Sequence, residues 1–273
     1  MKLVVKTLPQ LQRANGRVEI GFTSKNNSHS LTHLHQSGCL KALMPNNHSD
    51  IPEVVLINTA GGITGGDKLR IAVELKERVR ATVTTQTAER VYKAGHDLGK
   101  VEVQLNLKQD SFLDWLPQET ILFDKSALKR KITVNMHETS KLFMVESIIL
   151  GRCAMGETLT NNFFADHWRI LQDNKMRYAE SLKLSNASEL SGLATLGKNK
   201  ALATLLYVAS NAEEKVLHMR ALLKQCNLIS GASAWDGKLV TRLISDSPQR
   251  LRAALIFIIS EFRQKQLPRV WLM

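Results

Sequence analysis

Hydrophobic and polar residues alternate in several short runs over the first two thirds of the chain, which is the pattern of half-buried β-strands. In residues 70–75, Ile71, Val73 and Leu75 fall on one side of the expected strand. Further runs with the same period of two cover residues 78–85, 101–107 and 131–136. Residues 143–151 are more continuously hydrophobic, which predicts a strand buried on both faces.

The spacing of these strands indicates a mainly β fold. They follow one another closely with no helical segment between them, which argues against a doubly wound parallel sheet. Asp173-Asn174 predicts a hairpin turn between residues 167–171 and 176–184. We therefore expect a sandwich, a barrel or a coiled stack of strands.

The last third of the chain changes to a helical period. Asn211, followed by Glu214, predicts the start of one helix with Asn211 as its N-cap. Ser247 before Pro248 predicts the start of a second helix. The hydrophobic stripe expected to be buried on that second helix consists of Leu251, Leu255, Ile258 and Phe262.

Nothing in the sequence divides the chain into separate domains. Without a low-complexity linker, we expect one domain over 1–273, β-rich in 1–198, with a helical part at about 199–265 packed on it. Hydrophobic residues make up 44% of the chain, but no run is long enough for a membrane-spanning helix, and no secretory signal is recognisable. The three cysteines are far apart, as in reduced proteins, so we expect a cytoplasmic protein without a membrane partner.

The formal net charge of +12 suggests an anionic partner. The longest basic cluster covers only residues 129–131, and aromatic residues are 5% of the chain, too few for an obvious base-stacking surface. A generally basic surface is the simplest interpretation of this charge. Among specific partners we favour an acidic protein over nucleic acid, and a basic nucleic-acid-binding protein remains the alternative.

A glycine-rich segment precedes the run at 70–75, and its glycines are Gly61, Gly62, Gly65 and Gly66. A phosphate-binding P-loop requires lysine directly after its last glycine, but Asp67 stands there, and the following run is a strand rather than a helix. Nucleotide binding is therefore not expected. The segment instead predicts a tight turn in which Asp67 accepts hydrogen bonds from backbone amides.

Two other groups of residues could take part in acid–base catalysis or in metal binding. Glu119 and Asp124 are a potential acid–base pair, which would make the chain a hydrolase, although such carboxylates are more often solvated. His29, His33 and His35 have the same parity and would face one side of a strand. Imidazole binds nickel, copper and zinc, so these histidines, with His48 nearby, could form a transient metal site or be ordinary surface residues.

Several segments resemble the urease accessory protein D family, also called accessory protein H. They are "NTAGGITGGDKL", "ATVTTQTAERVYKA", "WLPQETILFD", "GRCAMGE" and "LPRVW", together with "LQRANGRVEIGF" and "SAWDGKLVTRLIS". These segments occur in the family's order and extend over nearly the whole chain. Glu119 and Asp124 lie in the third segment, and Arg152 and Glu157 lie in the fourth.

The resemblance implies a urease maturation scaffold without catalysis of its own. Members of the family bind accessory protein F, which recruits the GTPase accessory protein G, and the assembly acts on apo-urease during nickel insertion. The family fold is a β-helix-like stack of strands with a pair of helices. No tightly bound cofactor is implied, although transient Ni²⁺ binding and an internal passage for nickel are associated with the family.

A polar lining for such a passage can be proposed from the sequence. Asp67, Thr84, Thr85 and Gln86 are polar residues next to or within an otherwise hydrophobic strand, and buried polar groups need partners or water. A fully satisfied internal hydrogen-bond network is the alternative. Asp67, His33 and His35 are the candidate nickel ligands, and we expect weak or moderate binding because a passing ion must leave again.

Overall fold

The computed structural model describes residues 12–26, 28–46, 49–152, 155–185, 190, 192 and 195–273, and it is built around two facing β-sheets. The seven-stranded sheet has the order β14-β13-β11-β8-β5-β1-β2. Its strands are β1 (Asn15–Lys25), β2 (Ser28–Gly38), β5 (Lys68–Leu75), β8 (Gly99–Leu107), β11 (Ala127–Met136), β13 (Phe163–Gln172) and β14 (Lys175–Leu184).

The ten-stranded sheet has the main order β16-β17-β15-β12-β9-β6-β4-β3, with two short strands beside β12. Its main strands are β3 (Leu40–Leu43), β4 (Glu53–Asn58), β6 (Arg80–Thr85), β9 (Phe112–Leu116), β12 (Lys141–Leu150), β15 (Ala201–Val208), β16 (Ile229–Trp235) and β17 (Lys238–Ser245). The short strands are β7 (Glu89–Val91) and β10 (Thr120–Leu122).

Between β4 and β13 the chain passes repeatedly from one sheet to the other. Successive strands within each sheet therefore pair in parallel: β5 with β8, β8 with β11 and β11 with β13 on one side, and β4 with β6, β6 with β9 and β9 with β12 on the other. This coiled arrangement confirms the expected β-helix-like stack of strands. The hairpin at Asp173-Asn174 is also confirmed, because both residues have positive φ angles between antiparallel β13 and β14.

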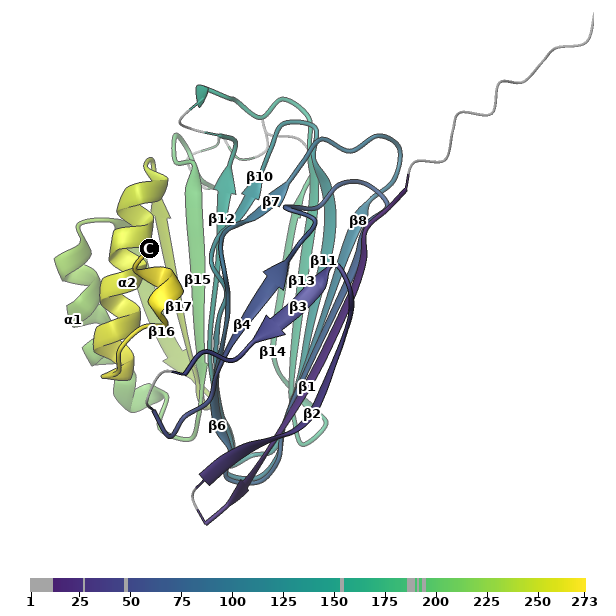
Figure 1. The fold of residues 1–273 in the computed structure, drawn as a ribbon. Coiled ribbons are helices and arrows are strands. Elements are labelled where there is room, and N and C mark those ends of the chain that lie inside the picture. The colour runs from purple at the N-terminus through teal and green to yellow at the C-terminus, as the bar shows by residue number, and fades with distance from the viewer. Residues whose placement is uncertain are drawn as a thin grey trace, which may run out of the picture.

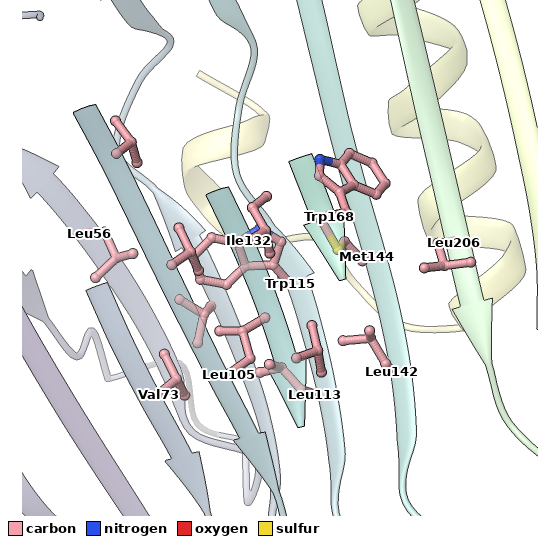
Figure 2. Close-up of a cluster of buried hydrophobic side chains, with 14 of the residues drawn as sticks. Leu56, Val73, Leu105, Leu113, Trp115, Ile132, Leu142, Met144, Trp168 and Leu206 are labelled. Atoms are coloured by element: carbon pink, nitrogen blue, oxygen red, sulfur yellow. The ribbon is translucent and has the colours of Figure 1, made fainter. Parts of the chain in front are cut away.

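Two hydrophobic clusters lie on opposite faces of the ten-stranded sheet. The inner cluster fills the space between the sheets, where Figure 2 shows Leu105 and Ile132 of one sheet near Trp115 and Leu142 of the other. The outer cluster lies between the ten-stranded sheet and the helices. β12 contributes to both clusters and is buried along nearly its whole length, as its continuous hydrophobic run predicted.

The helices cover only the outer face of the ten-stranded sheet (Figure 1). They are η3 (Glu213–Lys215), α1 (Val216–Cys226), α2 (Pro248–Arg263) and η4 (Arg269–Trp271). The segment expected to be helical, about 199–265, also contains β15, β16 and β17. No helix in the described parts of the chain is both long and apolar enough to cross a membrane.

The two predicted helix starts have different outcomes. Ser247 caps α2 as predicted, with its Oγ accepting a hydrogen bond from the backbone N–H of Arg250. The prediction for Asn211 is wrong, because α1 begins after the 3₁₀ turn η3 and has Lys215 at its N-cap. The Asn211 side chain instead accepts a hydrogen bond from the hydroxyl of Tyr207.

Candidate functional site

Asp67 fixes the glycine-rich turn that leads into β5. Its two carboxylate oxygens accept hydrogen bonds of 2.8 Å from the backbone N–H groups of Ala14 and Thr64, which confirms the predicted amide-binding role. Gly66 has a φ of +92°, and a side chain at Gly65 would meet the carbonyl oxygen of Asp97. The glycines therefore permit a sharp turn and a close approach between chain segments.

A cavity of about 130 Å³ lies next to this turn and between the two sheets. Its wall mixes hydrophobic residues from the inner cluster with an unusual number of polar ones. The polar residues of the wall are Asn58, Thr85, Gln86, Thr87, Glu89, Arg90, Gln118, Thr120, Arg130 and Glu146. Of these, Gln118, Thr120, Arg130 and Glu146 are buried and require internal partners or water, whereas Gln86, Thr87 and Arg90 are exposed, so the wall extends to the surface there.

Arg130 is the centre of a buried ion network in the cavity wall. Its guanidinium lies 2.5 Å from Glu146 Oε2 and 2.6 Å from Asp166 Oδ2. Trp115 Nε1 donates to Glu146 over 2.9 Å, and Trp168 Nε1 donates to Asp166 over 3.0 Å. The arrangement binds β11, β12 and β13 together across both sheets, with one cation between two carboxylates.

Burial changes the acidity of the carboxyl groups in this region. Desolvation raises the pKa of Glu89 to about 7, although Asn58 Nδ2 donates a hydrogen bond of 3.1 Å to its carboxylate. Burial also raises the pKa of Glu146, against the attraction of Arg130. For Arg130, burial lowers the pKa, but Asp166 and Glu146 outweigh it and hold the guanidinium charged. Glu89 is therefore poised to exchange a proton near neutral pH.

The four residues predicted to form a polar lining are not all brought together. Thr85 and Gln86 are part of the cavity wall, whereas Asp67 and Thr84 are not. Asp67 is occupied by the turn, and Thr84 points toward the C-terminal segment, where its hydroxyl donates to Leu116 O and accepts from Trp271 Nε1. Alternate residues of β6 thus serve opposite faces of the sheet.

The other predicted site residues make separate local contacts. Glu119 forms a 2.9 Å ion pair with Arg252 of α2. Asp124 accepts hydrogen bonds from the backbone and hydroxyl of Thr160, and those backbone contacts chiefly lower its pKa. Arg152 and Glu157 form an exposed ion pair of 2.8 Å with each other. Glu119 and Asp124 therefore do not share a partner, as an acid–base pair acting on one substrate would.

The prediction that three histidines share one side of a strand is wrong for His29. A bulge in β2 pairs Gly21 with His33 and Phe22 with Leu31, which changes the alternation between them. His33 and His35 lie on the outer face with Glu19, and His29 lies on the opposite face. His48 is outside the described residues. Within the described part of the chain, no three His, Cys, Asp or Glu side chains group closely enough to hold a metal ion.

The ion network and Glu89 were missed in the sequence. Arg130 occupies an inward position of β11, between the buried residues Leu128 and Ile132, and Glu146 interrupts the hydrophobic run of β12. A charged residue at an inward position was therefore the available signal. The sequence did not show that these two residues face each other across the sheets.

Comparison with known proteins identifies the family. The model of the UreD urease accessory protein family matches residues 14–272. The urease accessory protein UreD of Rhizobium leguminosarum bv. trifolii is 41% identical over 263 residues, which cover 95% of this chain and 96% of the relative. The UreD of Xanthobacter autotrophicus is 37% identical over 262 residues, covering 95% and 90%, respectively. The resemblance seen in the sequence is thereby confirmed, and the chain belongs to the UreD family of urease accessory proteins.

Proposed function

We propose that this chain is a urease maturation scaffold that assembles with accessory proteins F and G on apo-urease and passes nickel toward the urease active site. Membership of the urease accessory family supports the role in urease maturation. The observation that supports a nickel passage is the polar cavity inside the β stack, with Glu89 in its wall.

The cavity lies next to an external groove of about 1030 Å³ between the β3–β4 region and the C-terminal segment. Ile57 and Gln86 line both spaces, so the cavity and the groove adjoin at these two residues. We propose this groove as one mouth of the passage.

The chemistry of the wall suits an ion that binds briefly and leaves. Carboxylate, hydroxyl and amide oxygens with water hold nickel less tightly than a complete set of histidines or thiolates. Because the pKa of Glu89 is raised to about 7, an arriving cation would compete with a proton for this carboxylate, and a proton could take the place of a departing cation. The proposed metal contact is therefore Glu89 rather than Asp67, His33 or His35.

A role without catalysis is part of the proposal. Glu119 and Asp124, the carboxylates that could act in acid–base chemistry, are each engaged by structural partners. Both contacts fix one element against another, since Glu119 holds α2 and Asp124 holds the loop at Thr160. Measurable turnover of a substrate by the purified chain would contradict this part.

The passage is tested by urease activation with purified accessory proteins and limiting nickel. Glu89→Gln removes the exchangeable charge, and Gln86→Trp fills the boundary between cavity and groove. Both variants are expected to bind accessory protein F normally but to activate urease several-fold more slowly. The matched controls Glu138→Gln and Gln225→Trp, at exposed positions, should activate at the normal rate. Normal activation by both cavity variants would overturn the passage.

A further inference from the structure

A row of lysines crosses the outer face of the seven-stranded sheet, the face turned away from the helices (Figure 1). Lys68, Lys100 and Lys129 are direct neighbours in register on the parallel strands β5, β8 and β11, and all three are exposed. In the same register, Lys183 of β14 follows Lys129 after Ala165. Adjacent strands are about 4.8 Å apart, so this lysine row is a line of closely spaced positive charges.

Such a row is unfavourable for the isolated sheet. Like charges directly opposite each other on neighbouring strands destabilise a sheet. No carboxylate among the described residues forms an ion pair with Lys68, Lys100 or Lys129, whereas the adjacent row contains the pair Arg70–Glu102, with a 3.3 Å separation. The three lysines therefore have no direct carboxylate partner in the described part of the chain, and an external anion would reduce their mutual repulsion.

The surface beside the lysine row is shaped to receive a partner. A shallow groove of about 430 Å³ crosses β1, β5, β8 and β11 next to the row. The small side chain of Ala72 lies in its lining. The charged side chains of the lining are Arg17, Arg70 and Lys131 with Glu19 and Glu102, and two of the three cations are paired with these carboxylates. The groove runs across the strands, parallel to the lysine row. A linear segment lying in it would run alongside the lysine row, with one of its sides toward the lysines.

We propose that this face is a docking surface for an acidic helix of a partner protein, with Lys68, Lys100 and Lys129 as its anion contacts. The helical pitch of about 5.4 Å nearly matches the strand spacing of about 4.8 Å, so one carboxylate per turn meets one lysine per strand. In an extended segment, side chains on the same side are roughly 6.6–6.8 Å apart, so they do not match the spacing of the lysines. This surface is the solvent-facing side of the seven-stranded sheet, whereas the helices pack on the ten-stranded sheet. The docking proposal does not depend on the proposed passage.

Nucleic acid fits the same surface less well. Neither the lysine row nor the groove includes an aromatic side chain for base stacking. The carboxylate of Glu102 also lies among the cations, where it would repel a continuous phosphate backbone. A helix can avoid Glu102 because its acidic side chains are spaced.

The test measures binding of an alanine-rich helical peptide to the full chain by fluorescence anisotropy. Its glutamates are spaced alternately three and four positions apart, which gives about one carboxylate per turn on one side of the helix. Replacing Lys68, Lys100 and Lys129 together by Gln is expected to weaken binding about tenfold. The control replaces the exposed Lys175, Lys215 and Lys224 by Gln, which changes the net charge equally and should weaken binding less than about twofold. Equal weakening by both triple variants would show a general charge effect and overturn the proposal.

Three further measurements separate the specific surface from its alternatives. The triple variant of the lysine row should have a higher melting temperature than the natural chain, because the repulsion is removed, and the control triple should not. Changing the same three lysines to Glu should transfer binding to a lysine-containing helix of the same design. A single-stranded oligonucleotide that binds this row more tightly than the acidic peptide would overturn the assignment to a protein partner.

Discussion

Glu89 owes its high proton affinity to its position rather than to a neighbouring charge. Burial in the cavity wall is the largest cause of its raised pKa, and the hydrogen bond from Asn58 opposes the shift. The sequence around it, "TAERV", gives no indication of this, because an Ala-Glu-Arg segment is ordinarily solvated. Only the approach of β4 and β10 to β7 encloses the carboxyl group.

The raised pKa of Glu89 predicts that stability falls with increasing pH. Below about pH 4.5 the folded and unfolded states are both protonated, and between about pH 4.5 and about pH 7 only the unfolded state releases the proton. The loss approaches roughly 3 kcal/mol and is complete above the folded pKa. The free energy of unfolding, measured with urea, should fall more steeply with pH for the natural chain than for Glu89→Gln over this range. Parallel pH profiles for the two proteins would contradict the raised pKa of Glu89.

Arg130 compensates two buried carboxylates, so its removal has consequences beyond one lost contact. Arg130→Met would leave Glu146 and Asp166 close together without a cation, at an expected cost of roughly 3–5 kcal/mol in the free energy of unfolding. Urea denaturation measures this loss. Arg70→Met, which breaks an exposed ion pair, should cost less than about 1 kcal/mol.

The Arg130→Met variant should also recover stability as pH falls, because protonation removes the repulsion between the two carboxylates. A variant as stable as the natural chain at neutral pH would mean that the network contributes nothing to folding.

Elements that depend on local sequence were predicted well, and those that depend on distant neighbours were not. Alternation defined β5, β8 and β11, and Ser247 defined the start of α2. The capping pattern at Asn211 was equally good locally, but the segment continues through a 3₁₀ turn before α1 begins. Likewise, the bulge in β2 follows from its pairing with β1 and reverses the side on which His29 lies.

The turn at Asp67 provides a test at this level. Asp67→Ala removes two acceptors from amides in a buried turn and is expected to cost roughly 2–4 kcal/mol. Asp67→Asn keeps one carbonyl oxygen and should cost about half as much. Thermal unfolding of the two variants measures the difference. If neither variant is destabilised, the carboxylate does not hold the turn, and a role in metal contact regains support.

The ten-stranded sheet couples the two halves of the molecule because it is packed on both faces. Neighbouring residues of β12 belong to different clusters, with Leu142 in the inner one and Phe143 in the outer one. On the outer face, Arg263 of α2 forms a buried ion pair of 2.8 Å with Asp114 of β9. We therefore expect the helices and the sheets to unfold as one cooperative unit.

This coupling predicts that a destabilising substitution in either hydrophobic cluster lowers the stability of the helices and of the sheets alike. Leu142→Ala and Phe143→Ala should each lower the free energy of unfolding by about 2–5 kcal/mol. In both variants, helical circular dichroism and tryptophan fluorescence should report the same urea midpoint. Separate midpoints, with the helices lost first, would show that α1 and α2 form an independent unit.

The amino-acid sequence was sufficient for the family, the β-rich stack, the α2 start and the turn at Asp67. These features follow from short-range backbone geometry, in which side chains alternate along a strand and particular residues cap or turn the chain. The three-dimensional fold alone joined Arg130 to Glu146, enclosed Glu89 and aligned Lys68 with Lys100 and Lys129. Pairing register between strands far apart in sequence decides these contacts, and that register is set by packing of the whole core.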